Sequence, residues 1–226
     1  MPWDAWGDKD SPAKLPRGAR TIVKTLLEGT PHPIPRRESQ TATLTASRVS
    51  ADDLSALEAA VGSSNVSVDD NDRRWHLGGK STPDLLRRRI SALTPAPDAV
   101  VSPADHAETL LTLQVCNERG IAVVPFGGGT SVVGGVDAIQ DVHHSTIALH
   151  LVRTAALLEL DEVSLLATFG AGTTGPQAEA LLKPRGLTLG HFPQSFAFAS
   201  LGGYAATRSS GQASSGYGRF DDMVHA

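Results

Sequence analysis

The chain has 226 residues, and its 20 basic and 24 acidic side chains give a formal net charge of -4 at pH 7, so no basic surplus marks nucleic acid as a partner. Cys116 is the only cysteine, which excludes an internal disulfide and a cysteine-built metal site and suits a reducing cytoplasm. The sequence shows neither a signal-peptide pattern nor a run of about 20 apolar residues. We therefore expect a cytoplasmic protein without a membrane span.

Residues 1–97 are predicted to form an N-terminal extension that is mostly helical or irregular. This part is polar, dotted with prolines and weakly periodic. Ser50 precedes apolar residues at helical spacing, Leu54, Leu57 and Val61, which predicts a short capped helix. A basic cluster consists of Arg87, Arg88 and Arg89. We expect these arginines to lie on a solvated helix face, and phosphate binding is the alternative.

The composition changes near residues 95–97, and we predict a second domain at residues 98–226. Short apolar runs, helical patterns and glycine-rich joints alternate there, which is typical of an α/β or α+β domain. The predicted elements are a strand at 100–101, a helix at 104–119 with Gly120 as C-cap, a buried strand at 121–124, strands at 147–151 and 165–169, and a helix at 175–182 that Pro184 ends.

The strand at residues 121–124 runs directly into a glycine-rich loop. The residues expected to bind a ligand there are Pro125, Phe126, Gly127, Gly128, Gly129, Thr130 and Ser131. Glycines permit positive φ and close approach of a ligand, and successive N–H groups with two hydroxyls form a nest for a pyrophosphate. A mobile surface turn is the alternative. The Gly-Lys-Ser/Thr of an ATP or GTP loop is missing, so a kinase or GTPase is not expected.

Residues 170–175 also match a ligand motif, the G-x-G-x-x-G of a Rossmann turn between a strand and a helix. That fingerprint requires an acidic residue about 20 positions later. No Asp or Glu occurs between Glu179 and Asp221, and Pro184 shortens the helix. We therefore interpret these glycines as a tight strand-to-helix connection that lines the same site, and not as an NAD site.

A second candidate segment spans residues 193–211. Ser200 is expected to cap a helix whose first turn contains Gly202 and Gly203, where a flat or charged ligand can lie against the backbone. Close helix packing requires the same small residues, and composition leaves both interpretations open.

The combination of residues 125–131 and 193–211, followed by residues 216–222, resembles the FAD-binding domain of the vanillyl-alcohol oxidase (PCMH) type. Within that group the chain most resembles alkyldihydroxyacetonephosphate synthase and bacterial FAD-linked oxidases. The resemblance runs from about residue 99 to 224 and more loosely through residues 75–81. It implies an α+β fold, a two-subdomain FAD-binding domain that is apparently truncated at its C-terminus.

The resemblance implies that FAD is the cofactor and that residues 125–131 hold its pyrophosphate. It implies further contacts from the second segment: Gln194, Ser195, Phe196, Ala197, Phe198, Ala199, Ser200, Gly202, Gly203, Thr207, Arg208, Ser209 and Ser210. Ala197 stands where relatives often carry an acidic side chain, which weakens any role for it. Thr130, and not a histidine, follows the glycines, so we expect non-covalent FAD.

The remaining polar residues have structural interpretations beside functional ones. His143 and His144 lack an evident third ligand, so no metal site is expected. His191 is expected either to touch the cofactor or a substrate or to form a structural hydrogen bond. Arg208 is expected either to offset phosphate charge or to pair with Asp221 on the surface.

The resemblance implies that the chain is the FAD-binding N-terminal part of a flavoenzyme similar to alkyldihydroxyacetonephosphate synthase, which carries out an ether-lipid type of alkyl transfer. An FAD-linked oxidoreductase of a 2-hydroxy acid or alcohol is the alternative, and a non-catalytic fragment is the second alternative. The family's catalytic residues would lie beyond residue 226, so none is assigned. The complete protein is expected to take a small-molecule or lipid-precursor substrate, and the oligomeric state stays open.

Overall fold

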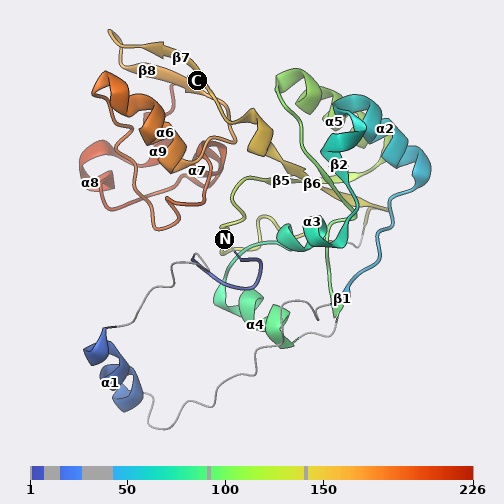
Figure 1. Ribbon diagram of the computed structural model, residues 1–226, viewed down its shortest axis with the longest axis horizontal. Helices are drawn as coiled ribbons and strands as arrows, with labels where there is room; N and C mark the ends of the chain where they lie inside the picture. The colour runs from blue at the N-terminus through green and yellow to red at the C-terminus, as the bar shows by residue number, and fades with distance from the viewer. Residues whose placement is uncertain (1, 8–15, 27–42, 91–92, 140–141, 226) are drawn as a thin grey trace.

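The computed structural model describes residues 2–7, 16–26, 43–90, 93–139 and 142–225. The chain forms two lobes, and helix α1 (Arg17–Leu26) lies apart from both (Figure 1). The first lobe is built on a mixed sheet, and the second carries a small hairpin and the helices of residues 175–223. This arrangement agrees with the predicted α+β class.

The sheet of the first lobe has the strand order β2-β4-β6-β5. Its strands are β2 (Val66–Ser67), β4 (Ala99–Val101), β6 (Thr146–His150) and β5 (Ala122–Phe126). Strands β4, β6 and β5 are parallel, and β2 is antiparallel to β4. Because β5 is the edge strand, its residues are half-buried or exposed apart from Phe126, so the prediction of a strand was right and that of a buried one was wrong.

Helices α2 (Ala51–Val61) and α5 (His106–Arg119) cover one face of this sheet (Figure 1). Ser50 caps the start of α2 as predicted, accepting a hydrogen bond from the N–H of Asp53, and Gly120 ends α5 as predicted, with φ of 66°. Helix α5 begins at His106, two residues later than predicted, because Asp105 caps it. The core between the layers consists of Leu57, Val61, Ala99, Val101, Cys116, Ile121, Ile147 and Leu149. Cys116 therefore packs as an apolar residue, and burial raises the pKa of its thiol to about 11.

Asp53 links the two covering helices to the loop before β6. Its carboxylate accepts hydrogen bonds from Ser50 at 2.8 Å, Arg119 at 3.0 Å and His144 at 3.0 Å. Burial by itself raises the pKa of Asp53, but these hydrogen bonds outweigh it and lower the pKa from 3.8 to about 2. His144 thus acts in a structural contact.

We expect Asp53→Asn to lower the free energy of unfolding by about 2 kcal/mol at neutral pH, the size of lost hydrogen bonds to a charged group. Because the pKa is lower in the folded state, this contribution is complete above the unfolded pKa of 3.8 and is lost as the pH falls through about 2. Urea titrations at neutral pH and at about pH 3 measure both effects, with exposed Asp52→Asn as the control. An equal difference between parent and Asp53→Asn at both pH values would contradict the prediction.

Elements of residues 43–97 complete the first lobe. Strand β2 and helix α2 belong to this part, and β1 (Thr43–Leu44) pairs with β3 (Leu93–Thr94) in a two-stranded parallel sheet. Helix α3 (Asp70–Trp75) lies against β4. Residues before and after position 97 therefore share one sheet and one core.

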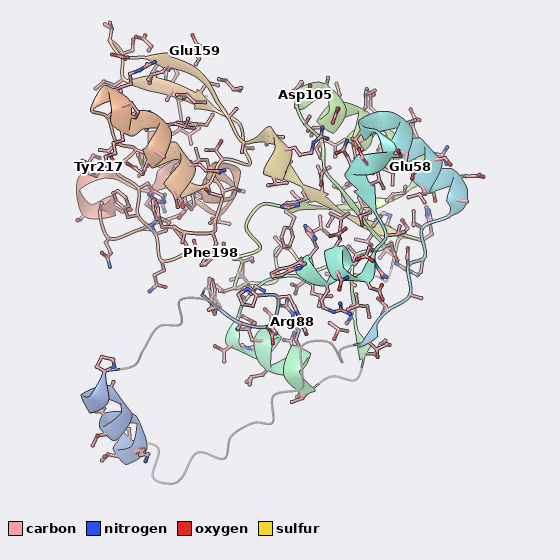
Figure 2. All side chains as sticks on the ribbon, in the orientation of Figure 1. Glu58, Arg88, Asp105, Glu159, Phe198 and Tyr217 are labelled. Carbon is pink, nitrogen blue, oxygen red and sulfur yellow. The ribbon has the colours of Figure 1, made fainter. Side chains whose placement is uncertain are left out.

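Helix α4 (Thr82–Ile90) carries the basic cluster, and its arginines have different surroundings. Arg87 is exposed and pairs with Asp84 at 3.0 Å, as expected of a solvated face. Arg88 is buried and donates hydrogen bonds of 3.0 Å to the carbonyl oxygens of Trp3 and Leu77, so a solvated position was the wrong prediction for it (Figure 2). The side chain of Arg89 lies outside the described residues.

The second lobe contains the hairpin of β7 (Leu157–Asp161) and β8 (Leu166–Phe169) and the helices α6 (Gly175–Leu182), α7 (Leu201–Thr207), α8 (Ser214–Tyr217) and α9 (Phe220–Met223). Short 3₁₀ helices occur at Ser63–Asn65, Leu151–Thr154 and Lys183–Arg185. Helix α6 matches its prediction, including the break at Pro184. The core of this lobe is Ala178, Ala199, Leu201, Tyr204 and Phe220.

Within the described ranges, no helix combines the length and apolar character that a membrane crossing requires. The described residues also contain no group of three or more metal-binding side chains. The ring of His143 lies 3.1 Å from the carbonyl oxygen of Gly120, and that of His144 contacts Asp53.

Candidate functional site

The predicted glycine loop leaves the sheet at the carboxyl end of β5. Pro125 and Phe126 are the last residues of this strand, and a proline is tolerated there because an edge strand can leave one N–H position unpaired. Phe126 lies beside His150, the last residue of β6. In proteins with parallel sheets, ligands commonly bind beside the carboxyl ends of the strands.

A cavity of about 280 Å³ opens at this edge. Its lining residues are Trp75, His76, Lys80, Phe126, Gly127, Gly128, Gly129, His150 and Phe198. Both predicted segments therefore contribute to one cavity, the first through residues 126–129 and the second through Phe198. The volume lies just below the usual range for a small-molecule pocket, so the cavity has room for part of a dinucleotide.

The two predicted segments are in direct contact at this cavity. A side chain at Gly128 would overlap the carbonyl oxygen of Phe198, and one at Gly127 would overlap the hydroxyl of Ser200. Figure 2 labels Phe198 where the two lobes meet. The bare backbone of these glycines is thus required for packing the first loop on the second segment.

The glycine loop also presents a row of backbone donors. Among the described residues, the N–H groups of Gly128, Gly129, Thr130 and Ser131 have no hydrogen-bond acceptor. Gly129 is buried and has φ of 62°, with the Phe126 ring packed against it. Buried or half-buried donors without acceptors are unusual in a folded chain, and successive N–H groups of this kind suit an anion.

The second segment forms a turn at residues 194–198 and then helix α7. Ser200 caps α7 as predicted, accepting a hydrogen bond of 3.3 Å from the N–H of Gly203. Gly202 is pressed against Ala171, and its N–H donates to the Ala171 carbonyl oxygen at 2.9 Å. Close packing therefore accounts for Gly202, whereas an added Cβ at Gly203 would meet only ordinary contacts.

Two glycines of residues 170–175 also allow close packing of backbone against backbone. Side chains at Gly170 and Gly172 would overlap the carbonyl oxygens of Thr154 and Leu151. Helix α6 begins with a capping box at Thr174. These glycines make the predicted tight connection beside the start of α7, but they are not among the residues that line the cavity.

The last residues of the predicted set do not line the cavity. Thr207, Arg208 and Ser210 are exposed, and Arg208 pairs with Asp221 at 2.8 Å. Ser209 lies 3.0 Å from Nε2 of buried His191. His191 therefore has a structural contact, and Arg208 is held by a surface ion pair.

A buried loop that follows α3 closes the other side of the site. His76 and Lys80 begin and end this loop, and the N–H of Lys80 donates to the carbonyl oxygen of Ser131 at 2.6 Å. The Lys80 ammonium donates to the carbonyl oxygens of Pro2 and Trp3 at 2.8 and 2.6 Å. Burial and the nearby charge of Arg88 lower the pKa of Lys80 to about 7. An anion nearby would favour its charged form.

The cavity residues that were not predicted from the sequence are Trp75, His76, Lys80 and His150. A signal was present for three of them, because residues 75–81 loosely share the family resemblance. His150 ends the strand next to β5, and the carboxyl ends of parallel strands share an edge. The pairing of β5 with β6 was needed to recognise it.

The arrangement fits the FAD that the resemblance implies. The glycine loop offers a diphosphate N–H groups that have no acceptor in the described part of the chain, and buried Lys80 lies beside that loop. Aromatic and imidazole rings line the rest of the cavity. A diphosphate prefers such donors, and flat rings pack well on aromatic side chains.

Comparisons with known proteins identify the family of this chain. The model of a family described as "FAD binding domain" matches residues 97–226, more than half of the chain. Alkyldihydroxyacetonephosphate synthase of Dictyostelium discoideum is 36% identical over 152 residues, 67% of this chain and 25% of that protein. The uncharacterised FAD-linked oxidoreductase YgcU of Escherichia coli K12 is 32% identical over 130 residues, 58% of this chain and 26% of that protein.

Solved structures show the same fold. An alkyldihydroxyacetonephosphate synthase structure matches 98% of this chain and 44% of its own, with a TM-score of 0.85 and 28% identity. A p-cresol methylhydroxylase structure matches 70% of this chain and 29% of its own, with a TM-score of 0.54, and at 17% identity it supports the fold alone. The chain spans about a quarter of the length of the curated relatives described above. With the glycine loop at the sheet edge and the family match over residues 97–226, the chain belongs to the FAD binding domain family.

Proposed function

We propose that this chain binds FAD with the pyrophosphate on the N–H groups of residues 128–131. The observation that carries the proposal is the cavity at which the glycine loop and Phe198 meet, next to backbone donors that lack acceptors among the described residues. Titration with FAD, followed by flavin fluorescence, tests it. We expect saturable binding that is tighter for FAD than for NAD or ATP, and equal binding of all three would contradict the proposal.

The proposed cofactor contacts include the whole predicted set. Residues 125–131 hold the diphosphate, and residues 194–200 run past the cofactor, with Phe198 against the cavity. Gly202, Gly203 and residues 207–210 are assigned the outer contacts. These residues lie in α7 or directly after it. They therefore contact the cofactor in this proposal only where the cofactor extends out of the cavity.

The cofactor is held without a covalent bond in this proposal. The support is the sequence of residues 125–135, which contains no histidine that can form a link to flavin. We expect acid precipitation of the FAD-loaded chain to leave the yellow colour in the supernatant. Flavin that stays with the precipitated protein after washing would overturn this assignment.

Residues 98–226 are the cofactor-binding domain in this proposal, and residues 1–97 are an N-terminal extension. The extension supplies β2 and α2 to the sheet and core of the first lobe and buried His76 and Lys80 to the cavity. Its contribution to FAD binding is therefore structural as well as direct.

For the complete protein we propose an activity similar to that named for the relatives, alkyldihydroxyacetonephosphate synthesis on a small-molecule or lipid-precursor substrate. Bound flavin supplies the redox and covalent chemistry of such enzymes, while the protein provides binding and orientation. This chain provides the cofactor site, and the catalytic residues stay unassigned.

The second candidate is oxidation of a 2-hydroxy acid or alcohol, which the similarity to an FAD-linked oxidoreductase favours. Lactate or glycolate added to the complete FAD-loaded protein without oxygen distinguishes the two. Bleaching of the flavin absorption favours the oxidoreductase, and an unchanged spectrum favours the synthase type.

A further inference from the structure

Two histidines of the cavity have ring nitrogens without a hydrogen-bond partner among the residues that the structure describes. His76 ends helix α3, and its Nδ1 lies 2.7 Å from the carbonyl oxygen of Asp72. Because a carbonyl oxygen only accepts, Nδ1 carries the proton and Nε2 of the neutral ring is an acceptor. Nε2 is buried and has no hydrogen-bond partner within the described residues.

His150 lies beside His76, with ring centroids 4.6 Å apart and an interplanar angle of 70°. It is half-buried, and among the described residues neither of its ring nitrogens forms a hydrogen bond. Phe126 contacts His76 at 4.5 Å between ring centroids. The three rings form one wall of the cavity next to the glycine loop.

Both imidazoles are neutral near pH 7. Burial lowers the pKa of His76, and burial together with the neighbouring His76 lowers that of His150 to about 4. Neutral imidazoles add no positive charge for a phosphate, but they accept hydrogen bonds from hydroxyl groups. A buried acceptor without a donor costs free energy that a suitable ligand group regains.

We propose that His76 and His150 bind a hydroxyl group of the dinucleotide next to its pyrophosphate, with the hydroxyl donating to Nε2 of His76. This inference rests on the proposed FAD binding. On either side of a dinucleotide's pyrophosphate the next polar groups are hydroxyls, those of the ribose in the ADP half and those of the ribityl chain in the FMN half. The shared chemistry is a hydroxyl donor about one sugar away from the glycine loop.

The test compares two replacements of His76 in the 226-residue chain. His76→Phe keeps a flat ring in contact with Phe126 and removes the acceptor, whereas His76→Gln keeps an acceptor oxygen. We expect His76→Phe to weaken FAD binding about fivefold to tenfold, the size of one hydrogen bond, and His76→Gln to stay within about threefold of the parent. His150→Phe is expected to weaken binding by about the same factor as His76→Phe.

Isothermal titrations with FAD, ADP and FMN locate the hydroxyl. A loss in His76→Phe for FAD and ADP supports the ribose, and a loss for FAD and FMN supports the ribityl chain. Exposed His106→Phe is the matched control and is expected to bind like the parent. Urea unfolding of every variant shows whether each is folded.

The outcomes separate this inference from the proposed function. If the parent binds FAD and His76→Phe binds it equally well, the inference is overturned while FAD binding stands. If His76→Gln is as weak as His76→Phe, the ring acts by packing and the acceptor role is overturned. A parent that binds none of the three ligands would overturn both proposals.

Discussion

Replacement of Gly128 by valine is expected to abolish FAD binding. A side chain at this position would overlap the carbonyl oxygen of Phe198 and lie 2.9 Å from the Cα of Ala199, both of them backbone atoms that cannot rotate away. The glycine loop and the second segment would have to separate, which opens the cavity and displaces the N–H groups proposed for the pyrophosphate. The additional branching of valine further restricts the backbone.

Titration with FAD and urea unfolding together measure this effect. We expect FAD affinity to fall by at least about 100-fold, since a displaced loop loses several charge-assisted hydrogen bonds at once. Gly216→Ala is the matched control, because a side chain there meets open space and its φ is not positive. A Gly128→Val chain that binds FAD as tightly as the parent would remove the glycine loop from the site.

Local signals predicted helices α2, α5, α6 and α7 and strands β4, β5, β6 and β8, and they left most of the other helices and strands unassigned. Ser50 and Ser200 cap helices because their hydroxyls accept from N–H groups three residues later, a contact that the sequence spacing alone specifies. Gly120 and Pro184 end helices for equally local reasons. Strand β7 was missed because most of its residues are exposed and its apolar residues do not alternate.

Contacts between distant residues were beyond such signals. Arg88 was expected in solvent because a run of arginines usually lies there, yet carbonyl oxygens of Trp3 and Leu77 bury it. The partners lie 85 and 11 residues away in the chain. The periodicity of α4 does not show which face of the helix Trp3 and Leu77 will cover.

The glycine loop shows how a sequence indicates a candidate site without explaining the role of each residue. Three successive glycines predicted close approach of a ligand to the backbone, and the cavity agrees with that position. The structure adds that Gly127 and Gly128 are bare because the second segment lies against them. The same residues therefore join the two lobes and shape the cavity.

Asp98 links residues on both sides of the predicted boundary at residue 97. Its carboxylate is fully buried and accepts hydrogen bonds from the N–H of Arg48 at 2.8 Å and the N–H of Thr146 at 2.7 Å. The Arg48 guanidinium also lies 3.3 Å from it. The Asp98 carboxylate thus accepts from two backbone N–H groups, that of Arg48 and that of Thr146 at the start of β6.

Asp98→Ala is expected to lower the free energy of unfolding by about 3 to 5 kcal/mol, because buried N–H groups and a cation then lose their acceptor. Asp98→Asn keeps one acceptor oxygen and should lose about half as much. Exposed Glu159→Ala is the control and should change stability by less than about 0.5 kcal/mol. Urea titrations of the three variants measure these differences. The contact spans the predicted boundary near residue 97, so we expect the parent and the variants to unfold in a single cooperative transition that includes residues on both sides of it. An Asp98→Ala chain within about 1 kcal/mol of the parent would show that this carboxylate does not hold the extension in place.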